Sequence, residues 1–219
     1  MTKESKQVCN SSEQASQNYH PALRCWHWAN AILIMGSLLI VLVNFTLLKP
    51  ENNTAYVQAQ LTSLSAKYTV HDATAFARFF SDKLWVVHAY IGFGIAALMV
   101  FRIILEFFLP AQQRLVYKLK NYLTAAGVNN KLVKITYAIF YLLVAIMAVT
   151  GLSVAYQNEL PFLKGNVAAV RAVLDIHYYT MYPITAFIAA HLAGVILAER
   201  KDSPGIVSGM INGGKRSSD

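Results

Sequence analysis

Four apolar stretches, each long enough to cross a lipid bilayer, are the feature that most constrains how this chain can fold. They cover roughly residues 29–48, 84–109, 135–156 and 176–198. A helix of about 20 apolar residues spans the hydrocarbon core of a bilayer, which is about 30 Å thick. Because that core holds no water to bond the backbone, each stretch is predicted to be an α-helix.

The composition agrees with a chain that lies in lipid rather than in water. Of its 219 residues, 56% are hydrophobic and only 14% are charged. We therefore predict an all-α integral membrane protein, a bundle of four transmembrane helices that forms a single domain over residues 1–219. The helices are expected at about 22–48, 82–109, 132–156 and 167–198, with flexible tails at 1–19 and 203–219.

The basic residues lie unequally on the two sides of the predicted helices. Thirteen of the 19 Lys and Arg fall on one side, which the positive-inside rule places in the cytoplasm. The other six face outward: Lys49, Lys67, Arg78, Lys83, Lys164 and Arg171. Both termini and the 110–134 loop are thus predicted to be cytoplasmic. The net charge of +8 is explained by this topology, so membrane lipid is expected as a partner and nucleic acid is not.

The outer connection over residues 49–83 is too long for a plain link between two helices. Its segment AYVQAQLTSLSAKY has partly helical apolar spacing. We expect it either to lie on the membrane surface or to cover a surface where a partner docks.

Four of the six histidines are placed where an imidazole is unusual. His20, before Pro21 at a helix start, and His71, in the polar stretch TVHDAT, are expected to be structural or solvated. The other four fall in the predicted membrane helices: His27, His88, His177 and His191. An ionisable side chain inside a membrane is costly and is by default a functional candidate.

The predicted topology places these four histidines in two layers. The first helix runs outward, so His27 lies near the cytoplasmic side, and the second runs inward, so His88 lies near the outer side. The fourth helix also runs inward, and its His177 and His191 are 14 residues apart, on one face and about 21 Å apart along the axis. The expected pairs are His27 with His191 in the inner layer and His88 with His177 in the outer layer.

Two facing imidazoles could hold a haem, could hold a zinc or copper ion, or could simply hydrogen-bond to each other. Zinc requires four protein ligands or an open water position, and no acidic or thiolate side chain completes either layer. Haem iron needs only two axial imidazoles, because the porphyrin supplies its other four ligands. Gly92 and Gly194, each close to a histidine, would leave room for a flat macrocycle. The cysteines form no CxxCH motif, which excludes covalently attached haem.

Arg102 is a charge placed inside the second apolar stretch, 14 residues after His88. It should therefore lie on the same helix face, at the depth of the inner pair. One interpretation is that it reaches the lipid headgroups or pairs with Glu106 one turn later. The other is that it binds a propionate of the inner haem, since arginine forms two parallel hydrogen bonds to a carboxylate.

The sequence resembles the prokaryotic cytochrome b561 superfamily, and most closely the b-type cytochrome subunit of membrane-bound nickel-iron hydrogenases. The segments that carry the resemblance are RCWHW, HAYIG, RLVYKLKNYL, YLLVAIMAVTGLSVAY and DIHYYTMYPITAFIAAHLAGVILAERKDSPGIVSGMINGGKR. It implies a four-helix protein of the bacterial inner membrane that holds two b-type haems, with the four membrane histidines as iron ligands. It also implies electron transfer between a periplasmic donor and quinone. The outer loop before His88 is longer than in hydrogenase subunits, which leaves the partner open.

The arrangement indicates electron transfer rather than bond chemistry by the chain alone. Our leading hypothesis is an electron-transfer subunit that takes electrons from a periplasmic iron-sulfur subunit of a hydrogenase or dehydrogenase and reduces quinone. One alternative is a stand-alone cytochrome b561 that oxidises a small diffusing donor. A transporter with histidines as proton or metal relays is a further alternative, but it gives no reason for two pairs at matched depths.

Overall fold

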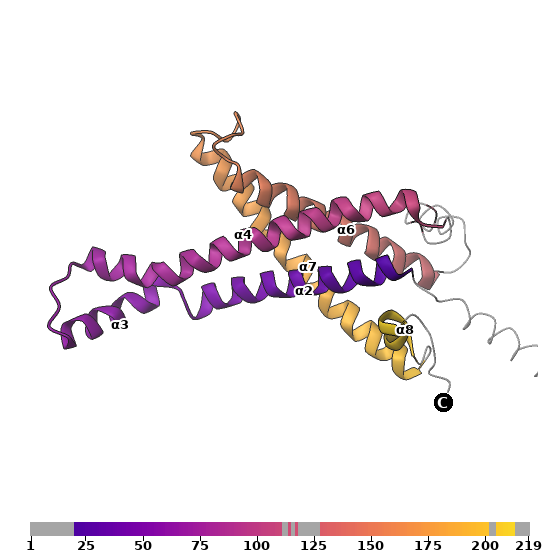
Figure 1. Cartoon of the computed structure of the whole chain (residues 1–219), viewed down its shortest axis with the longest axis horizontal. Coiled ribbons are helices and arrows are strands. Elements are labelled where there is room, and N and C mark those ends of the chain that lie inside the picture. The colour runs from indigo at the N-terminus through magenta and orange to yellow at the C-terminus, as the bar shows by residue number, and fades with distance from the viewer. Residues whose placement is uncertain (1–19, 111–113, 115–116, 118–127, 202–204, 213–219) are drawn as a thin grey trace, which may run out of the picture. The chain divides into compact units, whose positions relative to one another are not determined.

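Every element of the described chain is an α-helix. The computed structural model describes residues 20–110, 114, 117, 128–201 and 205–212 (Figure 1). The helices are α2 (Pro21–Thr46), α3 (Pro50–Ser63), α4 (Val70–Phe108), α6 (Val128–Ala155), α7 (Val167–Lys201) and α8 (Ile206–Asn212). Four of them hold candidate membrane spans: Pro21–Thr46, Val70–Phe108, Ile135–Ala155 and Val167–Arg200. The prediction of an all-α chain with four membrane helices is confirmed. The N-terminal tail and most of the RLVYKLKNYL segment lie outside the described residues.

The surfaces of the four spans suit contact with lipid. Large apolar side chains such as Ile32, Leu42, Phe107 and Ile196 are more than half exposed. An apolar surface of this extent would be unfavourable in water. In a bilayer the acyl chains would cover it.

The contacts group the described residues into two compact units. The first unit draws its described residues from Met1–Trp28, Val100–Met147 and Asp175–Asp219, and the second comprises Ala29–Met99 and Ala148–Leu174. Helices α2, α4, α6 and α7 each contribute residues to both units. Each unit is described by itself below.

Helix α4 begins at Val70, well before the predicted start at residue 82, because a capping box fixes its first turn. The N–H of Thr69 donates to Asp72 Oδ2 over 2.9 Å, and the N–H of Asp72 donates to Thr69 Oγ1 over 3.2 Å. The apolar run alone could not reveal this start, since the first turns of α4 mix polar and apolar residues. The other long helices begin and end close to their predicted limits.

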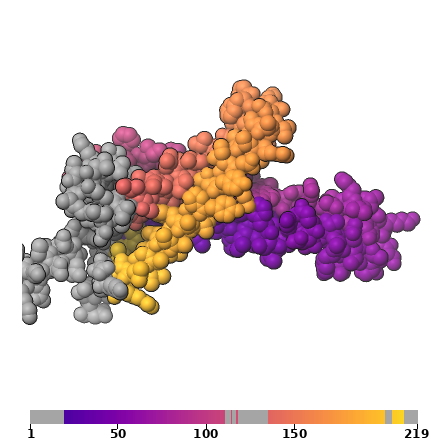
Figure 2. Space-filling view, turned by 180° about the vertical axis from the view of Figure 1, so that it is seen from behind, coloured from indigo at the N-terminus to yellow at the C-terminus, as the bar shows by residue number. Residues whose placement is uncertain are grey.

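Within the second unit, α3 folds back beside the first turns of α4 (Figures 1 and 2). Tyr68 lies in the connection between α3 and α4. Its hydroxyl donates to the carbonyl of Gln58 over 3.1 Å, which joins this connection to α3. Ala73 and Ala77 on α4 are buried. The connection over residues 49–83 is therefore a helical hairpin rather than an open loop.

The core of the first unit is small and apolar. Leu23 of α2 clusters with Leu105 of α4 and Leu109, and Ala22 packs against them. This cluster joins the start of α2 to the end of α4. The predicted C-terminal tail over 203–219 contains α8, which is hydrogen-bonded within this unit and is thus partly helical.

Gly94 of α4 lies close to Leu33 of α2 within the second unit. A Cβ added there would lie 3.0 Å from Leu33 Cδ1, whereas one added at Gly36 would lie 3.7 Å from Ile91 Cδ1, an ordinary contact. We therefore expect Gly94→Val to lower the free energy of unfolding by about 1–3 kcal/mol through overpacking. The thermal denaturation midpoint of the detergent-solubilised protein measures this loss.

The matched control is Gly94→Val combined with Leu33→Ala, because the shortened side chain no longer occupies the space that the valine enters. The combined loss should be smaller than the sum of the two single losses. Strictly additive losses would show that the two residues do not compete for space.

Candidate functional site

The structure brings His27 and His191 together in the first unit. His27 lies near the start of α2 and His191 lies in the second half of α7. Their ring centres are 6.2 Å apart and their planes cross at 66°. Two imidazoles that each place a nitrogen about 2 Å from one metal atom between them have ring centres about 6 Å apart. The spacing thus fits a pair of axial ligands on one iron.

Aromatic side chains surround this histidine pair. The ring of Phe187, one turn before His191 on α7, stacks on the imidazole at 5.9 Å with an interplanar angle of 4°. Tyr137 of α6 meets the same imidazole edge-on at 6.4 Å. Trp28 meets His27 edge-on at 5.6 Å. These three aromatic rings make the surroundings of the two imidazoles largely apolar.

The chemistry of the pair suits a haem better than a bare metal ion. Neither imidazole hydrogen-bonds to any described residue, so a ring nitrogen of each is available as a ligand. Among the residues that the structure describes, no three His, Cys, Asp or Glu side chains gather as a metal site. A Cβ built on Gly194, three residues after His191, would meet nothing within 4 Å, so no described side chain packs against this glycine. The residues present therefore fit a cofactor that brings its own equatorial ligands.

Arg102 lies buried on α4 in the same unit, with an exposed fraction of 7%. It forms an ion pair with Glu106 one turn later, as one of the two interpretations of the sequence predicted. Its guanidinium also lies over the Trp26 ring at 5.7 Å, and the Tyr141 ring stacks on Trp26 with ring centres 5.8 Å apart. The buried Nε of Arg102 donates no hydrogen bond to a described residue. That N–H remains available to a carboxylate.

His88 lies in the second unit, with a polar partner on the neighbouring helix. Its Nδ1 is 3.2 Å from the hydroxyl of Ser37 on α2, and Trp85 meets its ring edge-on at 5.4 Å. A Cβ built on Gly92, one turn later, would meet nothing within 4 Å. His177, by contrast, belongs to the first unit. The His88/His177 pair thus stays a prediction.

Sequence reasoning missed two polar residues on α2. Besides Ser37, Asn44 is buried with an exposed fraction of 4%, and neither atom of its side-chain amide has a hydrogen-bond partner among the described residues. Asn30, Ser37 and Asn44 are spaced seven residues apart in an otherwise apolar helix. This spacing places the three side chains on one face of the helix. The regular spacing of polar residues could have been recognised in the sequence.

The two remaining histidines lie outside this arrangement. His20 is exposed, and its Nδ1 accepts a hydrogen bond from the N–H of Ala22 over 3.3 Å at the start of α2. His71 is exposed in the first turn of α4. Neither imidazole lies beside a second histidine in the described contacts.

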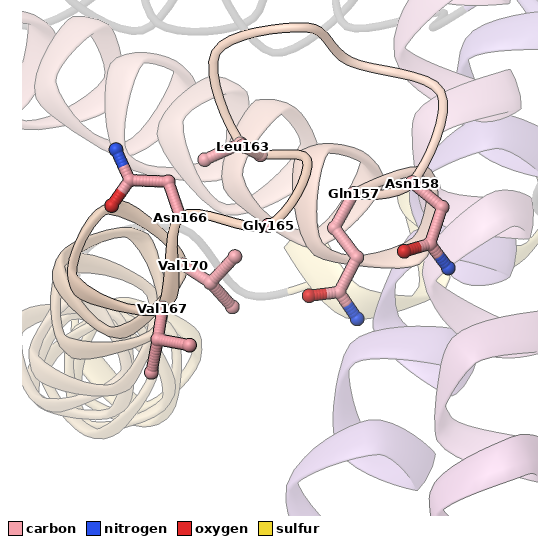
Figure 3. A pocket seen from close by; sticks show the side chains of 7 residues that line it. All are labelled: Gln157, Asn158, Leu163, Gly165, Asn166, Val167 and Val170. Atoms are coloured by element: carbon pink, nitrogen blue, oxygen red, sulfur yellow. The ribbon is translucent and has the colours of Figure 1, made fainter.

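A separate open cavity of about 360 Å³ lies in the second unit, where the chain turns from α6 into α7. Figure 3 shows the amide side chains of Gln157 and Asn158 on one side of it and Val170 on the other. No histidine or charged side chain lines it. It is distinct from the histidine pair and offers only amide and apolar contacts.

The four apolar spans and the pair of facing imidazoles define the class of a multi-pass membrane haem protein. A family model described as prokaryotic cytochrome b561 matches residues 18–213, which is most of the chain. The chain therefore belongs to the prokaryotic cytochrome b561 family. None of the curated proteins and none of the solved structures compared with the chain matches it.

Family membership settles the broad function. Proteins of this family are membrane electron carriers that bind haem b, and the family implies a four-helix bundle with two haems. It also suggests association with a membrane-bound oxidoreductase. The resemblance found in the sequence is confirmed at the level of the family.

The stabilising interaction between Arg102 and Glu106 should make the losses of unfolding free energy non-additive when the two side chains are replaced singly and together. Glu106→Leu leaves the buried guanidinium unpaired, which costs about 3–5 kcal/mol of unfolding free energy. Arg102→Leu removes the guanidinium that pairs with the Glu106 carboxylate and should also destabilise. The double variant removes both charges and should cost less than either single variant. Thermal denaturation midpoints of all four proteins measure this.

Glu159→Leu, which removes an exposed carboxylate, is the matched control and should change the midpoint little. Additive losses for Arg102→Leu and Glu106→Leu would show that the two side chains do not stabilise each other.

Proposed function

We propose that the chain carries electrons across the bacterial inner membrane, from an iron-sulfur subunit of a periplasmic hydrogenase or dehydrogenase to quinone. Two b-type haems serve as the carriers in this proposal, one between His27 and His191 and one between His88 and His177. The observation that carries it is the 6.2 Å separation of the His27 and His191 rings in a chain of the cytochrome b561 family.

The inner site would be built by the first unit. His27 and His191 would hold the iron, and a bound haem supplies reversible one-electron transfer at neutral pH. Phe187 and Tyr137 keep the iron ligands in an apolar environment, where a positive charge nearby has a strong effect. The buried Arg102 Nε supports binding of a propionate, while the rest of the guanidinium stays paired with Glu106.

The outer site would rely on Ser37 to orient His88. When the imidazole donates its Nδ1–H to the Ser37 hydroxyl, its Nε2 lone pair is left to bind iron. Such a hydrogen bond also fixes the orientation of the ring and raises the basicity of the ligand. Ser37 is thus a positioning residue for His88.

The distribution of basic residues supports the direction of transfer. It supports a topology with the termini in the cytoplasm, the His88 layer near the periplasm and the His27 layer near the cytoplasm. Electrons from a periplasmic donor would enter at the outer haem and leave from the inner haem to quinone. The hairpin of α3 and α4 lies in the outer connection and offers a surface for a docked subunit.

Alanine replacement of the four histidines tests the haem sites. His27→Ala and His191→Ala should each remove the same one of two haem components, because both rings contact one iron. His88→Ala and His177→Ala should each remove the other component. Haem content per chain, together with a redox titration of the b-type absorption band, measures the outcome.

The control variants are His20→Ala and His71→Ala, which should retain two haems per chain. Loss of the same component in His27→Ala and His177→Ala would overturn the pairing and the topology on which it rests.

Isolation in mild detergent tests the partner. The cytochrome should co-purify with a subunit that contains acid-labile sulfide, and the reduced haems should be reoxidised when a quinone is added. The alternative, a stand-alone cytochrome b561, predicts a cytochrome that migrates alone, without acid-labile sulfide, and that a small diffusing donor reduces directly.

A further inference from the structure

The short C-terminal helix α8 is tied at both ends to the helices that bear the inner histidine pair. At its start, the carboxylate of Glu199 on α7 accepts hydrogen bonds from the N–H of Gly205 over 2.8 Å and from the N–H of Val207 over 3.1 Å. At its end, carbonyls of α8 accept from two side chains of α2. Arg24 Nη1 donates to Ile211 over 2.8 Å, and Trp28 Nε1 donates to Met210 over 3.3 Å.

These contacts match what a helix needs at each end. The first N–H groups of a helix have no partner within it, and neither do its last carbonyls. The partial positive charge at the start of α8 meets a carboxylate, and the partial negative charge at its end meets a guanidinium. A helix of seven residues is unstable by itself, so α8 depends on these bonds for its order.

The turn into α8 is shaped for the bond to Glu199. Gly205 has a φ of +90°, a conformation that favours glycine over residues with a side chain. It directs the Gly205 N–H back toward α7, where the carboxylate accepts it. A glycine and an acidic side chain thus contribute to fixing the start of α8.

The three side chains that hydrogen-bond to α8 and to the residue before it lie near the two candidate iron ligands. Arg24 lies one turn before His27 on α2, and Trp28 follows it directly, with its ring edge-on to the imidazole at 5.6 Å. Glu199 lies about two turns after His191 on α7. Helix α8 therefore links the segment that carries His27 to the segment that carries His191.

We propose that α8 acts as a staple that sets the separation and the mutual angle of the His27 and His191 imidazoles, with Glu199, Arg24 and Trp28 as positioning residues. The proposal rests on the proposed haem site in this unit. Without the staple, the two helix segments can shift, the ring angle changes and water reaches the inner haem. Water favours the oxidised, more positive iron, so the midpoint potential of that haem falls.

The sign of this change separates the staple from a simple charge effect. Removing the negative charge of Glu199 would by itself raise the midpoint potential, because a nearby anion favours the oxidised iron. Loss of the staple lowers it. Glu199→Gln keeps the size of the side chain but removes one of its two acceptor oxygens, and it should lower the midpoint of the inner component. Glu199→Asp should restore part of the wild-type value.

The experiment uses the full-length protein in mild detergent, with both haems bound. In Glu199→Gln, the inner component should fall in midpoint potential and its low-spin ferric electron paramagnetic resonance signal should shift, because that signal depends on the angle between the axial imidazole planes. The outer component should be unchanged. Hydrogen exchange at the Gly205 and Val207 amides should become faster, which is a readout that needs no haem.

Two further variants keep the result interpretable. Trp28→Phe removes the N–H that bonds Met210 without changing any charge, and it should shift the same resonance signal. Arg200→Gln changes the neighbouring, exposed residue and should leave the inner midpoint potential and the resonance signal as in the wild type. An unchanged or raised inner midpoint in Glu199→Gln, or unchanged exchange at both amides, overturns the staple. A wild-type protein without two b-type components, or His27→Ala that retains both, instead overturns the haem assignment.

Discussion

The lack of hydrogen-bond partners for the backbone in lipid is the constraint on which the rest of this structure depends. It forces each span to be a helix, because only a helix satisfies its own N–H and C=O groups. Once the spans are helices, the period of about 3.6 residues decides which polar side chains can share a face. Everything that this chain can bind inside the membrane must be held by side chains on those faces.

Spacings of seven or fourteen residues appear on three of the membrane helices. On α2 they relate Asn30, Ser37 and Asn44, on α4 they relate His88 to Arg102, and on α7 they relate His177 to His191. Seven residues return to the same face of a helix with a drift of only about 20°. These polar groups therefore lie on one face of each helix, and the Ser37–His88 hydrogen bond and the Arg102–Glu106 ion pair each involve residues of these faces. A polar stripe within an apolar span is the simplest way to build cofactor sites at two depths.

The sequence was sufficient to predict the features that recur with a regular spacing along a membrane helix. The four spans and the level shared by His27 and His191 followed from length, charge and period, and the structure places those two rings 6.2 Å apart. The early start of α4 was not predicted because it depends on a side-chain bond between Thr69 and Asp72 in a polar segment. Helix α8 was not predicted because its order comes from Glu199, Arg24 and Trp28, which are distant in sequence from one another. Long-range bonds of single side chains leave no periodic pattern to read.

The two interpretations of Arg102 are compatible once its donors are considered separately. A guanidinium has five N–H donors in a planar fork, and an ion pair with one carboxylate uses only part of them. The Glu106 carboxylate offsets the cost of burying the charge, and the Trp26 ring covers one face of the guanidinium. The Nε–H is left buried and without a hydrogen bond to any described residue, which is unfavourable unless another acceptor completes it. A propionate would be an acceptor of the right charge, so under the proposed function the buried ion pair would hold Arg102 in place and leave its Nε–H for the haem.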